Sequence, residues 1–405
     1  MIEGKNVPKI RFPEFNGEWE EYELGQLMSR YEDHVETPHN GYERLGIRSH
    51  AKGVFHSHVN AGEELETAKM QRVAADKFIV NITFAWEHAV AITDENDAGL
   101  LVSHRFPQFS FDEKLQSGFF GFQMLDKRFK KHLELSSPGG AGRNRVLKID
   151  DMMKYTVRIP SVAEQKKIAS FLQMVDQIIC EIQSDLDKWK ELKRGMLQKM
   201  LPKEGESVPE IRFPGFSDDW KKHKLSDFSD IIGGGTPDTN NPAYWDGDID
   251  WYAPAEMEGQ RYAVSSVRKI TELGLQKSSA KILPANRTVL FTSRAGIGKM
   301  AILQRPAATN QGFQSLVLRD EVDPYFIYSM GDKIKKKAEG VASGSTFLEI
   351  SGKMLANLEV LIPTTEEQKE IASFFREIDD FITLYQCEND KWKELKKGLL
   401  QQMFV

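Results

Sequence analysis

The sequence has few cysteines: its 405 residues include only Cys180 and Cys387. Two cysteines cannot form a disulfide framework or a four-cysteine zinc site. Each lies in a segment with helical periodicity, so we expect both to be small, buried hydrophobic side chains. The nine histidines do not occur at metal-ligand spacing, so we predict no metal site in this chain.

Long apolar runs and a basic charge excess are also missing. No run of about 18 apolar residues occurs, and the first residues contain no apolar signal segment. We therefore expect a cytoplasmic protein without a membrane partner. The chain has 54 Lys and Arg against 60 Asp and Glu, a net charge of −6. This balance excludes a generally basic nucleic-acid binder but not local basic patches.

Complete catalytic motifs are absent. The Asn-Pro-Ala-Tyr sequence from Asn241 to Tyr244 resembles the Asn-Pro-Pro-Tyr loop of amino-methyltransferases, but it lacks the second proline and a neighbouring nucleoside-cofactor motif. Residues 295–299 suggest a phosphate loop, but they lack its first glycine and its Ser or Thr. We predict a chain that is not an enzyme by itself and holds no cofactor. A self-sufficient amino-methyltransferase using Asn241 and Tyr244 is the enzymatic alternative.

The chain repeats itself after about 200 residues. Residues 7–15 (VPKIRFPEF) return as residues 208–216 (VPEIRFPGF), and Ile-Pro followed by Glu-Gln-Lys occurs near the end of each half. A unit of this length is too long for a solenoid repeat. It indicates a duplicated module with an opening motif, a globular domain and a closing segment.

The closing segments, 159–201 and 362–405, have apolar residues at heptad spacing in the same register. They predict two long helices that bury their apolar stripes against each other. The residues we expect in this pairing are Ile178, Trp189, Phe381 and Trp392. The two tryptophans fit either the core of the helix pair or an anchor for another protein.

Short strands separated by glycine and proline predict an α+β domain in each half. The expected organisation is an opening motif with a first globular domain (1–158), a first helix (159–201), a linker with the repeated opening motif (202–217), a second globular domain (218–361) and a second helix (362–405).

Loops rich in glycine and polar residues recur in both halves. Glycines let main-chain N–H groups approach phosphates, Arg and Lys neutralise phosphates, and Arg, Asn and Gln can read base edges. Each loop alone fits a plain turn, but the set suggests a DNA-binding surface. The candidates are Arg48, Ser49, His50, Lys52, Arg143, Asn144, Arg145, Thr236, Ser293, Arg294, Lys299, Asn310, Gln311, Ser345 and Thr346. The basic clusters 127–131 and 333–337 fit either a solvated helix face or phosphate contacts.

These motifs together resemble the specificity (S) subunits of type I restriction–modification systems, the HsdS family. The resemblance rests on Gly-Gly-Thr-Pro at 234–237, Ser-Arg-Ala-Gly-Ile-Gly at 293–298, Thr-Asn-Gln-Gly-Phe at 309–313, Gly-Ser-Thr at 344–346 and the Ile-Pro…Glu-Gln closing motif. The first half departs from it, because residues 81–87 stand where Ser-Arg-Ala would be. The first domain therefore resembles another subclass of the same domain.

The resemblance implies two target-recognition domains separated by two long antiparallel, coiled-coil-like helices, in a pseudo-two-fold repeat. Each domain would read one half of an asymmetric, bipartite double-stranded DNA site, and the helices would set the spacer and dock two methyltransferase (M) subunits. S-adenosylmethionine, ATP and magnesium would reside on M and on restriction (R) subunits. A complex that only modifies DNA remains open, as does a structural adaptor that holds proteins in place of DNA.

Overall fold

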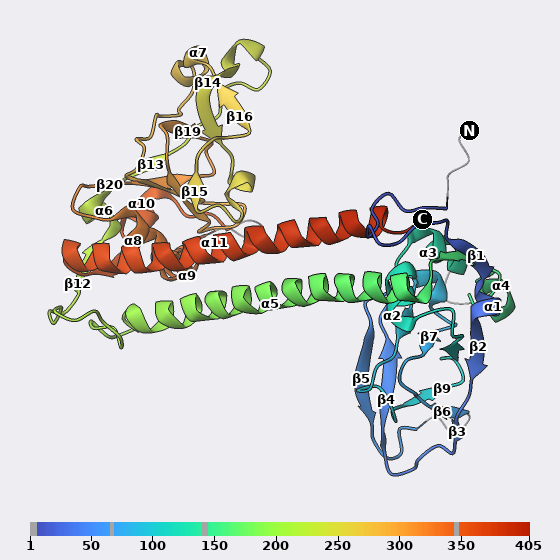
Figure 1. The fold of residues 1–405 in the computed structure, drawn as a ribbon. Helices are drawn as coiled ribbons and strands as arrows, with labels where there is room; N and C mark the ends of the chain where they lie inside the picture. The colour runs from blue at the N-terminus through green and yellow to red at the C-terminus, as the bar shows by residue number, and fades with distance from the viewer. Residues whose placement is uncertain (1–5, 65–68, 140–144, 344–347) are drawn as a thin grey trace. The chain divides into compact units, whose positions relative to one another are not determined.

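A computed structural model describes residues 6–64, 69–139, 145–343 and 348–405 (Figure 1). The chain divides into two compact units. Unit 1 consists of Met1–Ile182 and Glu388–Val405, and unit 2 consists of Gln183–Cys387. The helix α5 (Val162–Met200) begins in unit 1 and ends in unit 2, whereas α11 (Thr365–Gln402) begins in unit 2 and ends in unit 1. Each unit therefore contains a globular domain and a part of both long helices.

The globular domain of unit 1 is built on β-sheets. An antiparallel ribbon pairs β1 (Glu20–Glu23) with β11 (Thr156–Ile159). A four-stranded sheet has the order β2 (Met28–Tyr31), β10 (Gln108–Phe111), β7 (Phe78–Val80) and β8 (Val90–Ile92). A five-stranded sheet has the order β3 (His34–Val35), β6 (Met70–Arg72), β9 (Leu101–Ser103), β4 (Tyr42–Ile47) and β5 (Val54–Val59). The short helices are α1 (Leu24–Leu27), η1 (Ala85–Glu87), α2 (Ser117–Gln123), α3 (Lys127–Leu135) and α4 (Ile149–Met152).

Unit 2 repeats the ribbon and places a different pair of sheets on it. Its ribbon pairs β12 (Lys221–Lys224) with β21 (Glu359–Ile362). A five-stranded sheet has the order β13 (Ser229–Gly233), β20 (Gln314–Leu318), β17 (Thr288–Phe291), β18 (Met300–Leu303) and β15 (Tyr262–Ala263). A three-stranded sheet has the order β16 (Arg268–Ile270), β14 (Trp245–Tyr252) and β19 (Ala307–Thr309). The short helices are α6 (Leu225–Phe228), η2 (Pro242–Tyr244), η3 (Pro254–Met257), α7 (Glu272–Gln276), α8 (Pro324–Ser329), α9 (Gly331–Val341) and α10 (Gly352–Ala356).

Within each unit the two long-helix segments run antiparallel. In unit 2, Trp189 of α5 stacks on Phe381 of α11 with ring centroids 4.7 Å apart, and Lys193 Nζ lies 2.7 Å from Asp379 Oδ1. In unit 1, Lys396 of α11 forms an ion pair with Asp176 of α5. These two ion pairs correspond under the internal repeat, because Lys193 aligns with Lys396 and Asp176 with Asp379. The predicted fold class, two similar α+β domains with long antiparallel helices, is confirmed.

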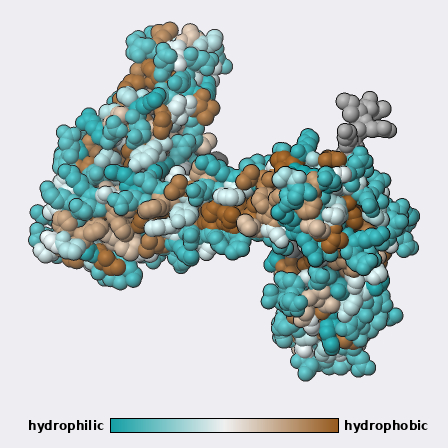
Figure 2. All heavy atoms as spheres, viewed as in Figure 1, coloured by the Kyte–Doolittle hydropathy of each residue, from teal (hydrophilic) through white to brown (hydrophobic). Residues whose placement is uncertain are grey.

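The expectation for the cysteines was wrong: Cys180 and Cys387 are both exposed. Each cysteine lies on the side of its long helix that faces away from the packed stripe, so helical periodicity alone did not place it in the core. Among the described helices, none combines the length and apolar character needed to cross a bilayer. Figure 2 shows mainly hydrophilic residues on the face of the molecule in view, with small hydrophobic patches between them.

Candidate nucleic-acid interface

The repeated sequence motifs meet where each globular domain attaches to its long helix, and we call this attachment the joint. In unit 2, Arg212 of the opening motif donates from Nε and Nη2 to the two carboxylate oxygens of Glu367, both at 2.7 Å. Glu367 is fully buried and also accepts a hydrogen bond of 3.3 Å from the Trp220 indole. The bond to Glu367 raises the pKa of Arg212 above its ordinary value, and this outweighs the opposite effect of burial. The Arg212 guanidinium is therefore held in its charged form, and its bidentate contact is the geometry in which a buried charge is best compensated.

Unit 1 has the same joint. Arg11 donates to the buried Glu164 at 2.8 and 2.7 Å. Trp19 is buried like Trp220, but its indole N–H has no hydrogen-bond partner among the described residues. The internal repeat in the sequence reveals these motifs but does not indicate that the arginine and the glutamate pair. The repetition of Arg, Trp and Glu at matching distances was the available signal.

The glutamine that follows each joint glutamate fixes a neighbouring short helix. Gln165 donates to the main-chain oxygen of Pro160 at 2.9 Å and accepts the main-chain N–H of Gln116, also at 2.9 Å. Gln368 donates to Pro363 at 3.1 Å and accepts the N–H of Asp323 at 3.1 Å. The closing motif thus attaches each globular domain to its long helix through side-chain bonds to the main chain.

The structure gathers several predicted DNA-contacting residues of unit 1 at the turn between β4 and β5. Arg48, Ser49, His50 and Lys52 all belong to this turn, and Arg48, His50 and Lys52 are exposed. The turn has left-handed main-chain conformations at His50 (φ 63°), Ala51 (φ 50°) and Gly53 (φ 80°). These conformations direct several side chains of a short segment outward.

The segment that contains η1 holds this turn in place. The main-chain N–H groups of His50 and Ala51 donate to the carbonyls of Glu87 and His88, both at 2.8 Å, and the Ser49 hydroxyl donates to the Glu87 carboxylate at 2.6 Å. Burial lowers the pKa of His88, although its hydrogen bond to the Met124 carbonyl acts in the opposite direction. His88 is therefore a neutral structural group behind the turn.

Aromatic side chains accompany the cations here. The Arg48 guanidinium lies 5.3 Å from the centre of the Phe55 ring, and that of Arg145 lies 5.4 Å from Trp86. Phe84, two residues before Trp86 in the sequence, is 39% exposed. We define residues 48–53, 82–86 and Arg145 as the turn surface. Its mixture of cations and exposed rings suits phosphate contact and base stacking. The aromatic members of this surface were not among the residues predicted from the sequence.

In unit 2 the predicted loops converge through main-chain bonds. The Gly235 N–H donates to the Thr309 carbonyl, and the Ser293 N–H donates to the Gly312 carbonyl, both at 2.8 Å. The Thr236 hydroxyl donates to the Gln311 side-chain oxygen. We define residues 234–236, 292–299 and 309–312 as the loop surface.

Glycine is required where these loops cross. A Cβ placed on Gly234 would lie 2.0 Å from the Asn310 carbonyl oxygen, and one on Gly235 would lie 2.3 Å from the Ser279 hydroxyl. Any side chain at these positions would push the loops apart. The Gly-Gly-Thr-Pro motif therefore has a packing role that brings Thr236 next to Gln311.

The predicted residues of the loop surface differ in what they can offer a ligand. Arg294 is half-buried and forms no ion pair or hydrogen bond with the described residues, whereas Lys299 donates to Glu258 at 3.0 Å. Ser293 is fully buried, and its hydroxyl has no hydrogen-bond partner among the described residues. The Asn310 side chain accepts the N–H of Gly312 at 2.8 Å. Arg294 and Gln311 are thus better placed for ligand contact than Ser293, which is buried and supports the loop from inside the domain.

The other predicted residues are not gathered on these surfaces. Arg143, Asn144, Ser345 and Thr346 lie outside the described residues. Among the helix residues, Trp189 and Phe381 contact each other, and Ile178 and Trp392 are both half-buried. The part of the chain that the structure describes contains no cluster of three or more His, Cys, Asp or Glu suited to a metal ion.

The fragment from Asn241 to Tyr244 forms a helix start. The Asn241 side chain accepts the Ala243 N–H at 3.1 Å and caps η2. The Tyr244 carbonyl accepts the Thr271 N–H at 3.0 Å, and a Cβ on Gly274 would lie 2.4 Å from that carbonyl. The polar group of Asn241 is thus engaged in local structure rather than presented to a ligand.

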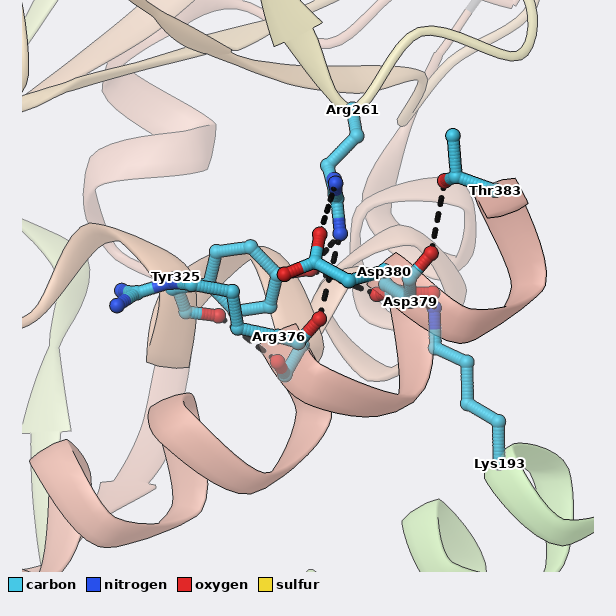
Figure 3. Close-up of polar contacts among 8 residues, drawn as sticks. Lys193, Arg261, Tyr325, Arg376, Asp379, Asp380 and Thr383 are labelled. Atoms are coloured by element: carbon cyan, nitrogen blue, oxygen red, sulfur yellow. Dashed lines mark hydrogen bonds and ion pairs between the residues drawn. The ribbon is translucent and has the colours of Figure 1, made fainter. Parts of the chain in front are cut away.

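A polar cluster links the second globular domain to α11 (Figure 3). The Tyr325 hydroxyl donates to Asp379 at 2.8 Å, and Lys193 pairs with the same carboxylate. Arg261, from the segment before β15, donates to Tyr325 at 3.2 Å and to Asp380 at 2.5 Å. Burial raises the pKa of Tyr325, and the charge of Asp379 adds to this effect, so the hydroxyl stays protonated and acts as a donor. The cluster fixes the domain on its helix at a second place beside the joint.

Comparison with known proteins defines the class of the chain. The profile of the family described as "Type I restriction modification DNA specificity domain" matches residues 60–193 and 217–394. These two matches cover well over half of the chain. The chain therefore belongs to this DNA specificity domain family, and each half carries one copy of the domain.

Individual relatives agree with this assignment. The MjaIX specificity subunit of Methanocaldococcus jannaschii is 35% identical over 192 residues, 46% of this chain and 44% of that protein. The EcoR124I/EcoR124II specificity subunit of Escherichia coli is 28% identical over 233 residues, 55% of this chain and 53% of that protein. The matched segments thus span about half the length of these curated relatives.

Solved structures share the fold. A type I restriction–modification S subunit from M. genitalium superposes with a TM-score of 0.62 at 14% identity, covering 98% of this chain and 99% of that one. A chain from a study of complex assembly in a type I restriction–modification system gives a TM-score of 0.55 at 16% identity, covering 95% and 97%.

Proposed function

We propose that this chain is the non-catalytic DNA specificity subunit of a type I restriction–modification complex. Each globular domain reads one half of an asymmetric, bipartite site on double-stranded DNA, unit 1 through the turn surface and unit 2 through the loop surface. The repeated joint carries this proposal. Because the same Arg–Glu–Gln joint holds two differently built domains, the chain combines one repeated attachment with two different DNA-reading domains.

The long helices set the spacing between the half-sites and dock two methyltransferase subunits. Half-sites one helical turn or more apart require a rigid spacer, and the antiparallel pairing within each unit supports such a role. S-adenosylmethionine, ATP and magnesium belong to the partner subunits, including the restriction subunits that join them. A self-sufficient methyltransferase is less well supported, because Asn241 caps a helix. A protein-only adaptor does not account for the family assignment.

Methylation sequencing after co-expression with the methyltransferase subunits tests the division of labour. Arg294→Ala with Gln311→Ala should relax base preference in one half of the recognised site and leave the other half unchanged. Arg48→Ala with Lys52→Ala should affect the opposite half. Removing one side chain that reads a base should reduce discrimination at that base pair by about 1–3 kcal/mol.

A matched control removes a cation outside both surfaces. Lys222 is exposed on the β12–β21 ribbon, and Lys222→Ala should keep the wild-type methylation pattern. If either double variant altered both halves equally, or neither half, the assignment of one reader to each unit would be wrong. Binding of the complex to duplex DNA should also weaken steeply with salt, because several phosphates are contacted.

A further inference from the structure

Unit 1 contains a cleft of about 800 Å³, and none of its described lining residues belongs to the turn surface. It opens where the end of α11 meets the start of α3 and the β1–β11 ribbon, and its described lining residues all belong to unit 1. This volume is in the range of sites that hold ligands or peptide segments.

The lining of the cleft is strongly cationic. Its described residues include only two acids, Glu21 and Asp126, against six cations: Lys127, Arg128, Arg158, Lys393, Lys396 and Lys397. Internal pairing accounts for part of this charge, since Arg158 pairs with Glu21 at 3.1 Å and Arg128 with Asp126 at 2.6 Å.

Two of the cations are available to a partner. Lys127 and Lys393 are exposed and form no ion pair with any described residue. Among the residues that the structure describes, Lys397 pairs only along its own helix, with Glu394 at 3.2 Å. An exposed excess of positive charge in a concave site attracts an anionic group.

Apolar side chains lie among the cations. Phe122, Leu400 and Phe404 are half-buried and line the same cleft. The Lys396 ammonium lies 5.5 Å from the centre of the Phe122 ring, so its charge sits directly beside an apolar wall. The cleft thus suits a ligand that combines carboxylates with an apolar side chain.

Unit 2 shows which segment of the chain lies against α9, the helix that corresponds to α3. The helices α3 and α9 correspond to each other when the fully buried Phe129 is matched with the fully buried Ile334. In this alignment Arg128 corresponds to Lys333. Lys333 donates to the main-chain oxygen of Pro202, and Arg128 donates to that of Val405 at 2.8 Å.

The chain that follows Pro202 is acidic. The carboxylate of Glu204 lies 3.8 Å from the ammonium of Lys336 on α9. In unit 1 the residue that corresponds to Lys336 is Lys131, which pairs within α3 with Glu134 at 3.0 Å. An acidic segment therefore accompanies this helix in unit 2, and it makes a turn in which the Glu206 N–H donates to the Lys203 carbonyl at 3.1 Å and Gly205 has a φ of 87°.

We propose that the cleft of unit 1 is a docking site for an acidic segment of another protein chain. Carboxylates of that segment pair with Lys127 and Lys393, and an apolar side chain contacts Phe122 and Leu400. A DNA backbone fits this cleft less well, because phosphates offer nothing to its apolar wall. The proposal does not depend on the DNA-reading function.

Fluorescence anisotropy with the full-length chain tests it. The probe is a labelled heptapeptide that repeats residues 201–207 with the lysine replaced by glutamate, so that it carries one leucine and three acids. We expect saturable binding, reduced roughly tenfold by Lys127→Glu with Lys393→Glu. A probe with glutamine in place of each glutamate should not bind.

The internal repeat supplies the matched control. Lys190 is the exposed counterpart of Lys393 on α5, and Lys190→Glu should leave probe binding unchanged. The milder pair Lys127→Gln and Lys393→Gln should also weaken binding while keeping the wild-type melting temperature. Equal binding to all variants, or no saturable binding to the wild-type chain, would overturn the proposal. The proposal would also be overturned if a 20-base-pair DNA duplex bound the double variant more weakly than the wild-type chain while the peptide did not bind.

Discussion

In unit 1 the helix that packs on α5 presents a glycine, whereas in unit 2 the corresponding helix on α11 presents a tyrosine. The bonds from Gln165 to Gln116 and from Gln368 to Asp323 align α2 with α8, which places Gly118 opposite Tyr325. The ring contacts Trp19–Phe119 (5.8 Å) and Trp220–Phe326 (5.7 Å) support this alignment.

The consequences differ between the units. A Cβ on Gly118 would lie 3.5 Å from the Ala169 Cβ, so α2 lies close against α5. Tyr325 instead reaches Asp379 through its hydroxyl, and Arg261 closes the cluster. The two domains share one joint, but the second attachment is a close contact at Gly118 in unit 1 and a polar, bridged cluster around Tyr325 in unit 2. A duplicated frame can therefore keep its anchor while the contacts around it diverge.

Breaking the shared joint should have the largest effect. Glu164→Ala and Glu367→Ala each leave a largely buried arginine without its carboxylate, which costs about 3–5 kcal/mol. We expect each variant to lower the melting temperature of its own unit in differential scanning calorimetry. Lys222→Ala, away from the salt bridges of the joint, should not. A large effect of one variant and none of the other would show that the two joints are not equivalent.

Removing the tyrosine hydroxyl should expose the difference between the units. Tyr325→Phe deletes a buried donor to Asp379 and should destabilise unit 2 by about 1–2 kcal/mol. The control is Tyr328→Phe, because the Tyr328 hydroxyl makes no hydrogen bond to a described residue. Equal melting temperatures for the Tyr325 variant and the wild type would mean that the cluster in Figure 3 does not stabilise the attachment.

The ring stack between the long helices should contribute slightly less. Phe381 is 43% exposed, so Phe381→Ala should cost about 1 kcal/mol through loss of the stack on Trp189. Ile178→Ala changes the corresponding position of unit 1, where the aligned partner is Trp392. Chemical denaturation followed by tryptophan fluorescence measures both variants. A larger loss for Ile178→Ala would mean that burial outweighs stacking.

The smallest effect should be a pH dependence confined to unit 1. Burial lowers the pKa of His88, so the unfolded chain binds a proton more readily than the folded chain below about pH 6.5. The stability of unit 1 should therefore fall as the pH is lowered from 7 towards 5. His88→Asn, which tolerates the left-handed main chain (φ 63°), should flatten this dependence in thermal melts. A steeper slope in the variant would contradict this assignment.

The long helices and the duplication could be predicted because their signals are periodic or repeated along the chain. The strands at residues 77–80, 89–93, 288–292 and 315–318 could be predicted because they are short β-branched or apolar runs, and they appear as β7, β8, β17 and β20. The loops that form the loop surface were also recognisable, since their glycines mark crossings.

The remaining features depend on contacts between residues far apart in the chain. Arg261 and Asp380 are separated by 119 positions, and nothing in either local sequence indicates that they meet. Phe84 and Trp86 read as ordinary apolar residues until η1 places them beside the β4–β5 turn. The exposure of Cys180 and Cys387 depends on which side of a helix is covered, and heptad spacing gave that side incorrectly.

The division of the long helices between the units has a consequence for biosynthesis. All of unit 2 lies in one continuous stretch, Gln183–Cys387, whereas unit 1 needs Glu388–Val405 to complete it. On the ribosome, the half that is translated first must therefore wait for the final turns of α11, while the half translated second can mature ahead of it. A released chain truncated before residue 388 should leave the β1–β11 side sensitive to protease and the β12–β21 side protected.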